Sequence, residues 1–143
     1  RLRLAPGRAD RSMARPETVI VAGVGFRRGT TAEEIEALVR QALALHGAER
    51  IDLLATDAGK ASEPGLQDAA RRLSVALAAC AAADLQGVTD RILTRSARVL
   101  EATGLPSIAE AAALVAAGPN SRLLGPRLAS TRVTCAIAVG DGR

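Results

Sequence analysis

The stretch from Val19 to Thr31 constrains the fold more than any other part of the sequence. It reads Val-Ile-Val-Ala-Gly-Val-Gly-Phe-Arg-Arg-Gly-Thr-Thr, and it passes from an apolar run, through glycines and arginines, to a segment of helical composition. We predict a strand over residues 18–22, a sharp turn made by the three glycines, and a helix over residues 32–45. The unpaired N–H groups and the dipole of a helix N-terminus favour an anion in such a loop. Because the glycine spacing fits neither the dinucleotide fingerprint nor the Walker loop, the motif indicates an anion without identifying it.

The rest of the chain alternates apolar runs with helical patterns. A β-α-β-α-β order implies right-handed crossovers and a largely parallel sheet, and the last two strands are close enough in sequence to pair antiparallel. We therefore predict a three-layer α/β/α domain over residues 17–143, with a mixed, mostly parallel sheet of about five strands. The elements expected after the first helix are strands over 51–55, 74–79, 123–124 and 133–139, and helices beginning at Pro64, over 81–86, over 96–102 and over 108–117.

The basic charge is concentrated at the N-terminus. The net charge is +4, and residues 1–15 carry five arginines against one aspartate, so the remaining 14 basic and 14 acidic residues balance. We interpret residues 1–16 as a flexible basic tail. A neutral body with a single aromatic residue argues against nucleic acid as a partner.

The sequence also favours a cytoplasmic protein with no membrane partner. No apolar run approaches the roughly 18 residues of a membrane span, and the N-terminus lacks the apolar centre of a secretory signal. Cys80 and Cys135 lie in apolar runs, where buried thiols are expected.

Ligands of open α/β sheets bind beyond the carboxyl ends of the strands. In this chain, two loops are expected to meet at that edge of the sheet. The loops cover residues 25–31 and 56–63, and together they suit a ligand that carries carboxylates or phosphates. The candidate ligand-binding residues are Gly25, Arg27, Arg28, Gly29, Thr30, Thr31, Asp57, Lys60, Ser62 and Glu63.

Each charged candidate has a second interpretation that involves no ligand. Lys60 is the single lysine beside 18 arginines, so it is either retained for its compact ammonium or a solvated loop residue. Glu63 is an acid–base group, a partner for Lys60, or a favourable charge at the N-terminus of the second helix. Arg27 and Arg28 are either carboxylate forks or solvated side chains.

Several chemistries have no support in the sequence. Two cysteines and one histidine without close spacing make a zinc site improbable, so we predict no metal and no cofactor. The Gly-x-Ser-x-Gly elbow is missing, and His46, next to Gly47, is explained by its place at a helix C-terminus.

Four motifs follow one another along the chain: Gly23–Ile35, Leu54–Leu66 with its lysine and Glu-x-Gly-Leu ending, Thr103–Leu114 with Gly-x-x-Ser-x-x-Glu-Ala, and Thr134–Ala138. In this order they resemble the CobE family of cobalamin biosynthesis, whose domain also forms the C-terminal part of CbiG, the cobalt-precorrin-5A hydrolases. The resemblance spans about residues 18–139. Phe26 stands where the family typically has cysteine, which argues against thiol chemistry in this loop.

The resemblance implies a stand-alone protein of the CobE type, because the chain is shorter than a full hydrolase. The resemblance implies that the protein binds a corrin-precursor tetrapyrrole and acts as a carrier or accessory factor. Other enzymes of the pathway are further candidate partners. The alternative is a CbiG-like hydrolase in which Lys60 and Glu63 are catalytic. A nucleotide-binding module is a third hypothesis, against which the glycine spacing argues.

Overall fold

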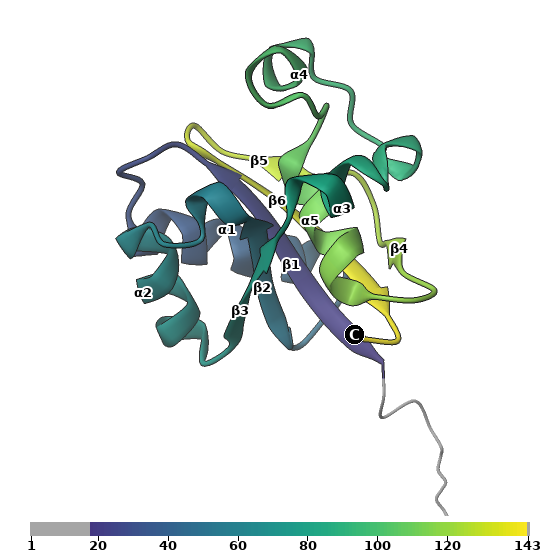
Figure 1. Cartoon of the computed structure of the whole chain (residues 1–143). Helices are drawn as coiled ribbons and strands as arrows, with labels where there is room; N and C mark the ends of the chain where they lie inside the picture. The colour runs from purple at the N-terminus through teal and green to yellow at the C-terminus, as the bar shows by residue number, and fades with distance from the viewer. Residues whose placement is uncertain (1–17, 143) are drawn as a thin grey trace, which may run out of the picture.

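The structure is a computed structural model that describes residues 18–142, so the predicted tail over residues 1–16 lies outside the described part (Figure 1). The elements in chain order are β1 (Val19–Phe26), α1 (Ala32–Leu45), β2 (Leu53–Asp57), the 3₁₀ turn η1 (Ala58–Lys60), α2 (Pro64–Leu73), β3 (Ala76–Cys80), α3 (Ala82–Gln86), the 3₁₀ turn η2 (Thr89–Arg91), α4 (Ala97–Thr103), α5 (Ile108–Ala117), β4 (Arg122–Leu123), β5 (Leu128–Ala129) and β6 (Val133–Gly140).

One mixed sheet of six strands organises the domain. Its order is β3-β2-β1-β6-β4, and β5 also pairs with β6. The β1–β2 and β2–β3 pairs are parallel, whereas β6 runs antiparallel to β1, β4 and β5. The predicted α/β class with a mixed sheet is confirmed, and the short strand β5 is the element that the sequence did not reveal.

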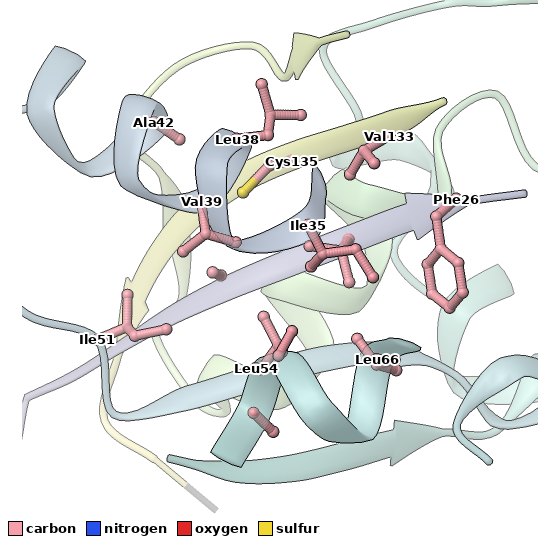
Figure 2. Close-up of a cluster of buried hydrophobic side chains, with 14 of the residues drawn as sticks. Phe26, Ile35, Leu38, Val39, Ala42, Ile51, Leu54, Leu66, Val133 and Cys135 are labelled. Atoms are coloured by element: carbon pink, nitrogen blue, oxygen red, sulfur yellow. The ribbon is translucent and has the colours of Figure 1, made fainter. Parts of the chain in front are cut away.

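Helices α1 and α2 cover one face of the sheet through large aliphatic side chains (Figure 2). Ile35, Leu54 and Leu66 are fully buried there, and burying such a side chain contributes about 1.5–3 kcal/mol. The thiol of Cys135 lies in the same cluster, where burial raises its pKa to about 12. Helical spacing in the sequence predicts one apolar stripe on α1 from Ile35 to Leu45. This prediction is wrong for Leu45, which is the last residue of α1 and is 63% exposed.

Helix α5 covers the other face by a much closer contact. A Cβ atom on Gly23 would lie 2.1 Å from the carbonyl oxygen of Ala109, and one on Gly140 would lie 2.3 Å from that of Ala117. Alanines and glycines therefore let the helix backbone approach β1 and β6 directly. The prediction that Gly23 and Gly25 form the turn is wrong, because both lie inside β1. The left-handed position of the loop is Gly29, with φ +83°.

No single helix among residues 18–142 is long and apolar enough to cross a membrane. Helices α4 and α5 together have sufficient length and hydropathy, but they are bent by 68° relative to each other. The cytoplasmic location expected from the sequence stays a prediction.

Candidate functional site

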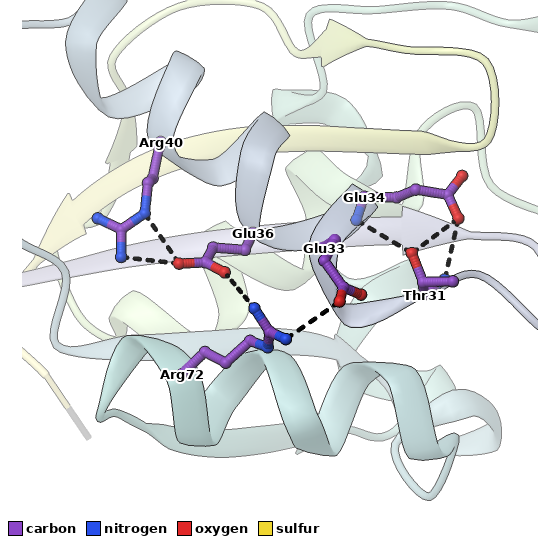
Figure 3. Close-up of polar contacts among 6 residues, drawn as sticks. All are labelled: Thr31, Glu33, Glu34, Glu36, Arg40 and Arg72. Atoms are coloured by element: carbon purple, nitrogen blue, oxygen red, sulfur yellow. Dashed lines mark hydrogen bonds and ion pairs between the residues drawn. The ribbon is translucent and has the colours of Figure 1, made fainter.

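The loop after β1 is held by its own backbone and by the cap of α1. The amide of Arg27 donates to the carbonyl of Arg132 at 3.2 Å, and the Thr30 hydroxyl donates to the carbonyl of Arg27 at 2.6 Å. Two pairs at the start of α1 have the spacing of a capping box, Thr30 with Glu33 and Thr31 with Glu34, and the second pair forms it. The hydrogen bonds from the Thr31 backbone and hydroxyl lower the pKa of Glu34 (Figure 3). The polar groups of Thr30 and Thr31 therefore already have partners within the chain.

The carboxylate of Glu63 lies against this loop. One oxygen, Oε2, is 2.8 Å from Nη1 of Arg28, and the other accepts a hydrogen bond from the amide of Gly29 at 3.3 Å. The N-terminus of α2 is close to that of α1, since a Cβ on Gly65 would lie 2.0 Å from the carbonyl oxygen of Thr30. An anion therefore does lie at the glycine loop, and it belongs to the chain itself.

Lys60 ends the 3₁₀ turn after β2 and reaches back to β1. Its ammonium donates to the carbonyl of Phe26 and lies 5.3 Å from the centroid of the Phe26 ring. Thr56 ties the same two strands together, because its buried hydroxyl donates to the carbonyl of Val24 at 2.8 Å. These contacts fix a cation at the carboxyl ends of the two central parallel strands.

A hollow of about 360 Å³ opens at these strand ends, and we call it the strand-end hollow. Arg28, Asp57 and Lys60 supply its charged side, and apolar side chains from β3, α3 and the start of α5 supply the other side. It is lined by Arg28, Asp57, Ala58, Gly59, Lys60, Cys80, Ala82, Leu85, Gln86, Thr103, Leu105 and Ile108. The hollow lies at the edge where open α/β sheets bind ligands.

A second hollow, of about 560 Å³, lies between the N-termini of α1 and α2, and we call it the helix-end hollow. Its arginines pair within the chain: Arg71 with Asp68, and Arg72 with Glu33 at 3.1 Å and Glu36 at 3.4 Å (Figure 3). The lining residues are Gly29, Thr30, Thr31, Ala32, Glu33, Glu63, Pro64, Gly65, Asp68, Arg71 and Arg72. Its charges are thus balanced locally.

The structure divides the predicted site residues between the two hollows. Arg28, Asp57 and Lys60 line the strand-end hollow, whereas Gly29, Thr30, Thr31 and Glu63 line the helix-end hollow. Gly25, Arg27 and Ser62 line neither of them. The two residues proposed for catalysis, Lys60 and Glu63, therefore face different spaces.

The sequence interpretation missed the apolar side of the strand-end hollow. Leu85, Leu105 and Ile108 come from α3 and from the region where α4 passes into α5. Apolar side chains in a sequence look the same whether they fill a core or line a ligand site, so no motif marked them. Their role depends on how the chain after β3 folds back over the sheet.

Ser107 and Glu110 have the spacing of a capping box at the start of α5, and Glu110 has a larger structural role as well. The Ser107 hydroxyl accepts a hydrogen bond from the amide of Glu110 at 3.3 Å. The buried carboxylate accepts the amides of Leu93 at 2.6 Å, Thr94 at 3.0 Å and Arg127 at 3.0 Å. Glu110 therefore joins two loops to α5. Among the described residues, no group of three or more histidines, cysteines and acidic residues is placed to hold a metal ion.

Comparison with known proteins identifies the relatives of the chain. The family described as Cobalamin synthesis G C-terminus matches residues 20–138. Protein CobE from Sinorhizobium sp is 37% identical over 121 residues, which are 83% of this chain and 79% of that protein.

Two solved structures resemble the chain in both sequence and fold. The structure of CobE, a protein from the cobalamin (vitamin B12) biosynthetic pathway, matches with a TM-score of 0.81 and 38% identity over 85% of this chain and 90% of that one. The cobalamin biosynthesis protein chiG from Agrobacterium tumefaciens str. C58 matches with a TM-score of 0.68 and 45% identity over 84% of this chain and 97% of that one.

Proposed function

Because the chain belongs to the Cobalamin synthesis G C-terminus family and is a cobalamin biosynthesis protein of the CobE/CbiG type, we propose that its strand-end hollow binds a corrin-precursor tetrapyrrole as a carrier or accessory factor. The observation that carries the proposal is the mixed lining of this hollow. Arg28 and Lys60 supply positive charge to it, and Leu85 and Ile108 supply apolar surface. A corrin precursor has the matching chemistry, with an apolar macrocycle and peripheral carboxylates.

Arg28 can bind a ligand carboxylate with little loss of free energy from its existing ion pair. Its side chain is 68% exposed, and its pair with Glu63 is a surface ion pair, which contributes about 0–1 kcal/mol. A guanidinium can hold a carboxylate by two parallel hydrogen bonds. Lys60 adds a second positive charge, and Arg27, on the exposed part of the same loop, can reach a carboxylate outside the hollow.

The helix-end hollow contributes less to this proposal. Gly29, Thr30, Thr31 and Glu63 line it, and their polar groups hold the loop after β1 and the N-terminus of α1 in place. We assign them to the support of Arg28. Ser62 remains a candidate by its position in the loop after β2 alone, and Gly25, near the end of β1, by the sequence motif alone.

Hydrolysis of a precorrin is the second candidate function, and one observation favours it. Lys60 and Asp57 line the same hollow, so a cation and a carboxylate could act on one ligand. Glu63 faces the helix-end hollow, which favours Asp57 over Glu63 as the partner of Lys60 in any such reaction.

A visible-absorbance titration with hydrogenobyrinic acid tests the binding proposal. We expect a saturable spectral shift for the wild type, and about tenfold weaker binding for Arg28→Ala and for Lys60→Ala, since each loses a charge-assisted contact of about 1.4 kcal/mol or more. Arg40→Ala is the matched control, because this exposed arginine pairs with Glu36 on α1 and lines neither hollow.

Three outcomes separate the candidates. No spectral shift with the wild type contradicts direct binding of the tetrapyrrole. Binding of ATP in its place would support the nucleotide-binding hypothesis. Conversion of a precorrin that is lost in Lys60→Ala, while binding is largely retained, would favour the hydrolase over the carrier.

A further inference from the structure

We propose that α4 forms a second wall of the strand-end hollow, and that Leu100 contacts the apolar face of the bound macrocycle. This inference rests on the proposed function. It extends the site to a helix that contributes none of the charged residues of the hollow, and it gives the exposed Leu100 of α4 a role in binding.

The size of the hollow makes a second wall necessary. Pockets for drug-sized ligands have volumes of roughly 300–1,000 Å³, so a hollow of about 360 Å³ is at the lower end of that range. A tetrapyrrole with four rings and many acid side chains is larger than a drug-sized ligand. Part of the macrocycle must therefore extend past the hollow and contact its rim.

Helix α4 supplies that rim next to the apolar lining. Thr103, the last residue of α4, lines the hollow, and Leu105 lines it two residues later. Residues three apart on a helix are neighbours on its surface, so Leu100 lies next to Thr103. The side chain that continues the apolar lining beyond the hollow is therefore Leu100.

The exposure of Leu100 is unexplained by the fold alone. Among the described residues, the exposed large hydrophobic side chains are Leu45 at 63%, Leu93 at 57% and Leu100 at 49%. A single exposed leucine is ordinary, as Leu45 is at the far end of α1. Leu100 differs from Leu45 in its place, because it lies one helical turn before Thr103, which lines the strand-end hollow, so its exposed side chain adds apolar surface beside that hollow.

The attachment of α4 permits it to move towards a ligand. The helix has no buried residue, and it lies away from the sheet at the top of Figure 1. Its ends are fixed: the amide of Ser96 donates to Pro106 at 3.3 Å, and Gln86 donates to the carbonyl of Gly104 at 3.1 Å. Gly104 has φ +78°, so it can pivot where a residue with a side chain would be strained.

The test compares two exposed leucines in the whole protein. Leu100→Ser and Leu45→Ser are each titrated with hydrogenobyrinic acid by visible absorbance. We expect Leu100→Ser to bind about tenfold more weakly than the wild type, because the contact of a leucine with an apolar face is lost, and Leu45→Ser to bind within about twofold. Thermal unfolding checks that both variants remain folded.

A second measurement uses the composition of the chain. The sequence contains no tryptophan and no tyrosine, so Leu100→Trp and Leu45→Trp each carry a single reporter. Addition of the tetrapyrrole should quench the emission of Leu100→Trp much more strongly than that of Leu45→Trp, because energy transfer falls with distance.

The outcomes distinguish this inference from the proposed function. Equal affinity of Leu100→Ser and wild type, together with weaker binding of Arg28→Ala, overturns the second wall and leaves the charged site standing. Absence of any binding by the wild type overturns both. Equal quenching of the two tryptophan reporters also contradicts a contact at α4.

Discussion

Helices α5 and α4 are consecutive in the chain and begin with the same signal, yet the fold uses them in opposite ways. Ser107 caps α5 and Ser96 caps α4, and each hydroxyl accepts an amide three residues later at 3.3 Å. Nine residues of α5 are buried, against none of α4, so α5 belongs to the core, whereas α4 contacts it through the partly buried Val99. Local capping is therefore equal, and tertiary packing decides which helix is rigid.

The strand-end hollow lies between these two kinds of structure. Ile108 opens α5 and Thr103 ends α4, and both line the hollow. The α5 side is fixed by backbone contact with β1 and β6, whereas the α4 side has no fully buried residue and is held by hydrogen bonds at its ends and by the partly buried Val99. In the binding site that we propose, one wall is therefore fixed and the other is adjustable.

The largest effect should come from breaking the contact between α5 and β1. Gly23→Ala places a methyl group 2.1 Å from the Ala109 carbonyl oxygen, which the backbones can relieve only by moving apart. We expect a loss of at least about 3 kcal/mol in the free energy of unfolding, measured by urea denaturation.

The control for this variant separates steric overlap from backbone conformation. Gly47→Ala meets no atom within 4 Å, but Gly47 has φ +67°. The free energy of unfolding of Gly47→Ala should therefore fall by only about 1–2 kcal/mol, which is the cost of placing an alanine in the left-handed conformation. Similar losses for Gly23→Ala and Gly47→Ala would mean that α5 does not pack against β1 as closely as described.

The next largest loss of stability is expected at Glu110, whose carboxylate joins the loop before α4 to α5. Glu110→Gln keeps the shape but replaces one accepting oxygen with an NH₂ group, which must face an N–H donor in a buried site. We expect about 2–4 kcal/mol of destabilisation in urea denaturation. Glu101→Gln, on the exposed surface of α4, should change stability by less than about 0.5 kcal/mol. Equal effects of the two changes would contradict the role of Glu110.

The sequence predicted the elements whose ends carry local signals. The bounds of α1 were correct because Thr31 and Glu34 form a capping box and His46-Gly47 ends the helix. The bounds of α5 were correct for the same kind of reason, with Ser107 before it and Gly118 after it. Strand β1 was predicted too short, because Gly23 looks like a turn residue until the position of α5 is known.

The charged residues of the candidate site could be predicted from the sequence, whereas the arrangement around them could not. Arg28 and Lys60 could be expected at one hollow, since the carboxyl ends of neighbouring parallel strands meet at one edge of the sheet. The separation of Lys60 from Glu63 could not be predicted, because it depends on the place of α2 against the N-terminus of α1. The apolar wall depends likewise on how α3, α4 and α5 fold back.

The most subtle test removes the two matched caps. Ser107→Ala should lower the global free energy of unfolding by about 1–2 kcal/mol, because α5 unfolds only with the whole domain. Ser96→Ala should change it by less than about 0.5 kcal/mol, because α4 can open while the core stays folded. In hydrogen exchange, the amides of α4 should instead exchange about fivefold faster in Ser96→Ala, which corresponds to a loss of about 1 kcal/mol in the local opening free energy. If Ser96→Ala lowers global stability as much as Ser107→Ala does, α4 is part of the cooperative core, and the adjustable wall that we infer from its exposure is wrong.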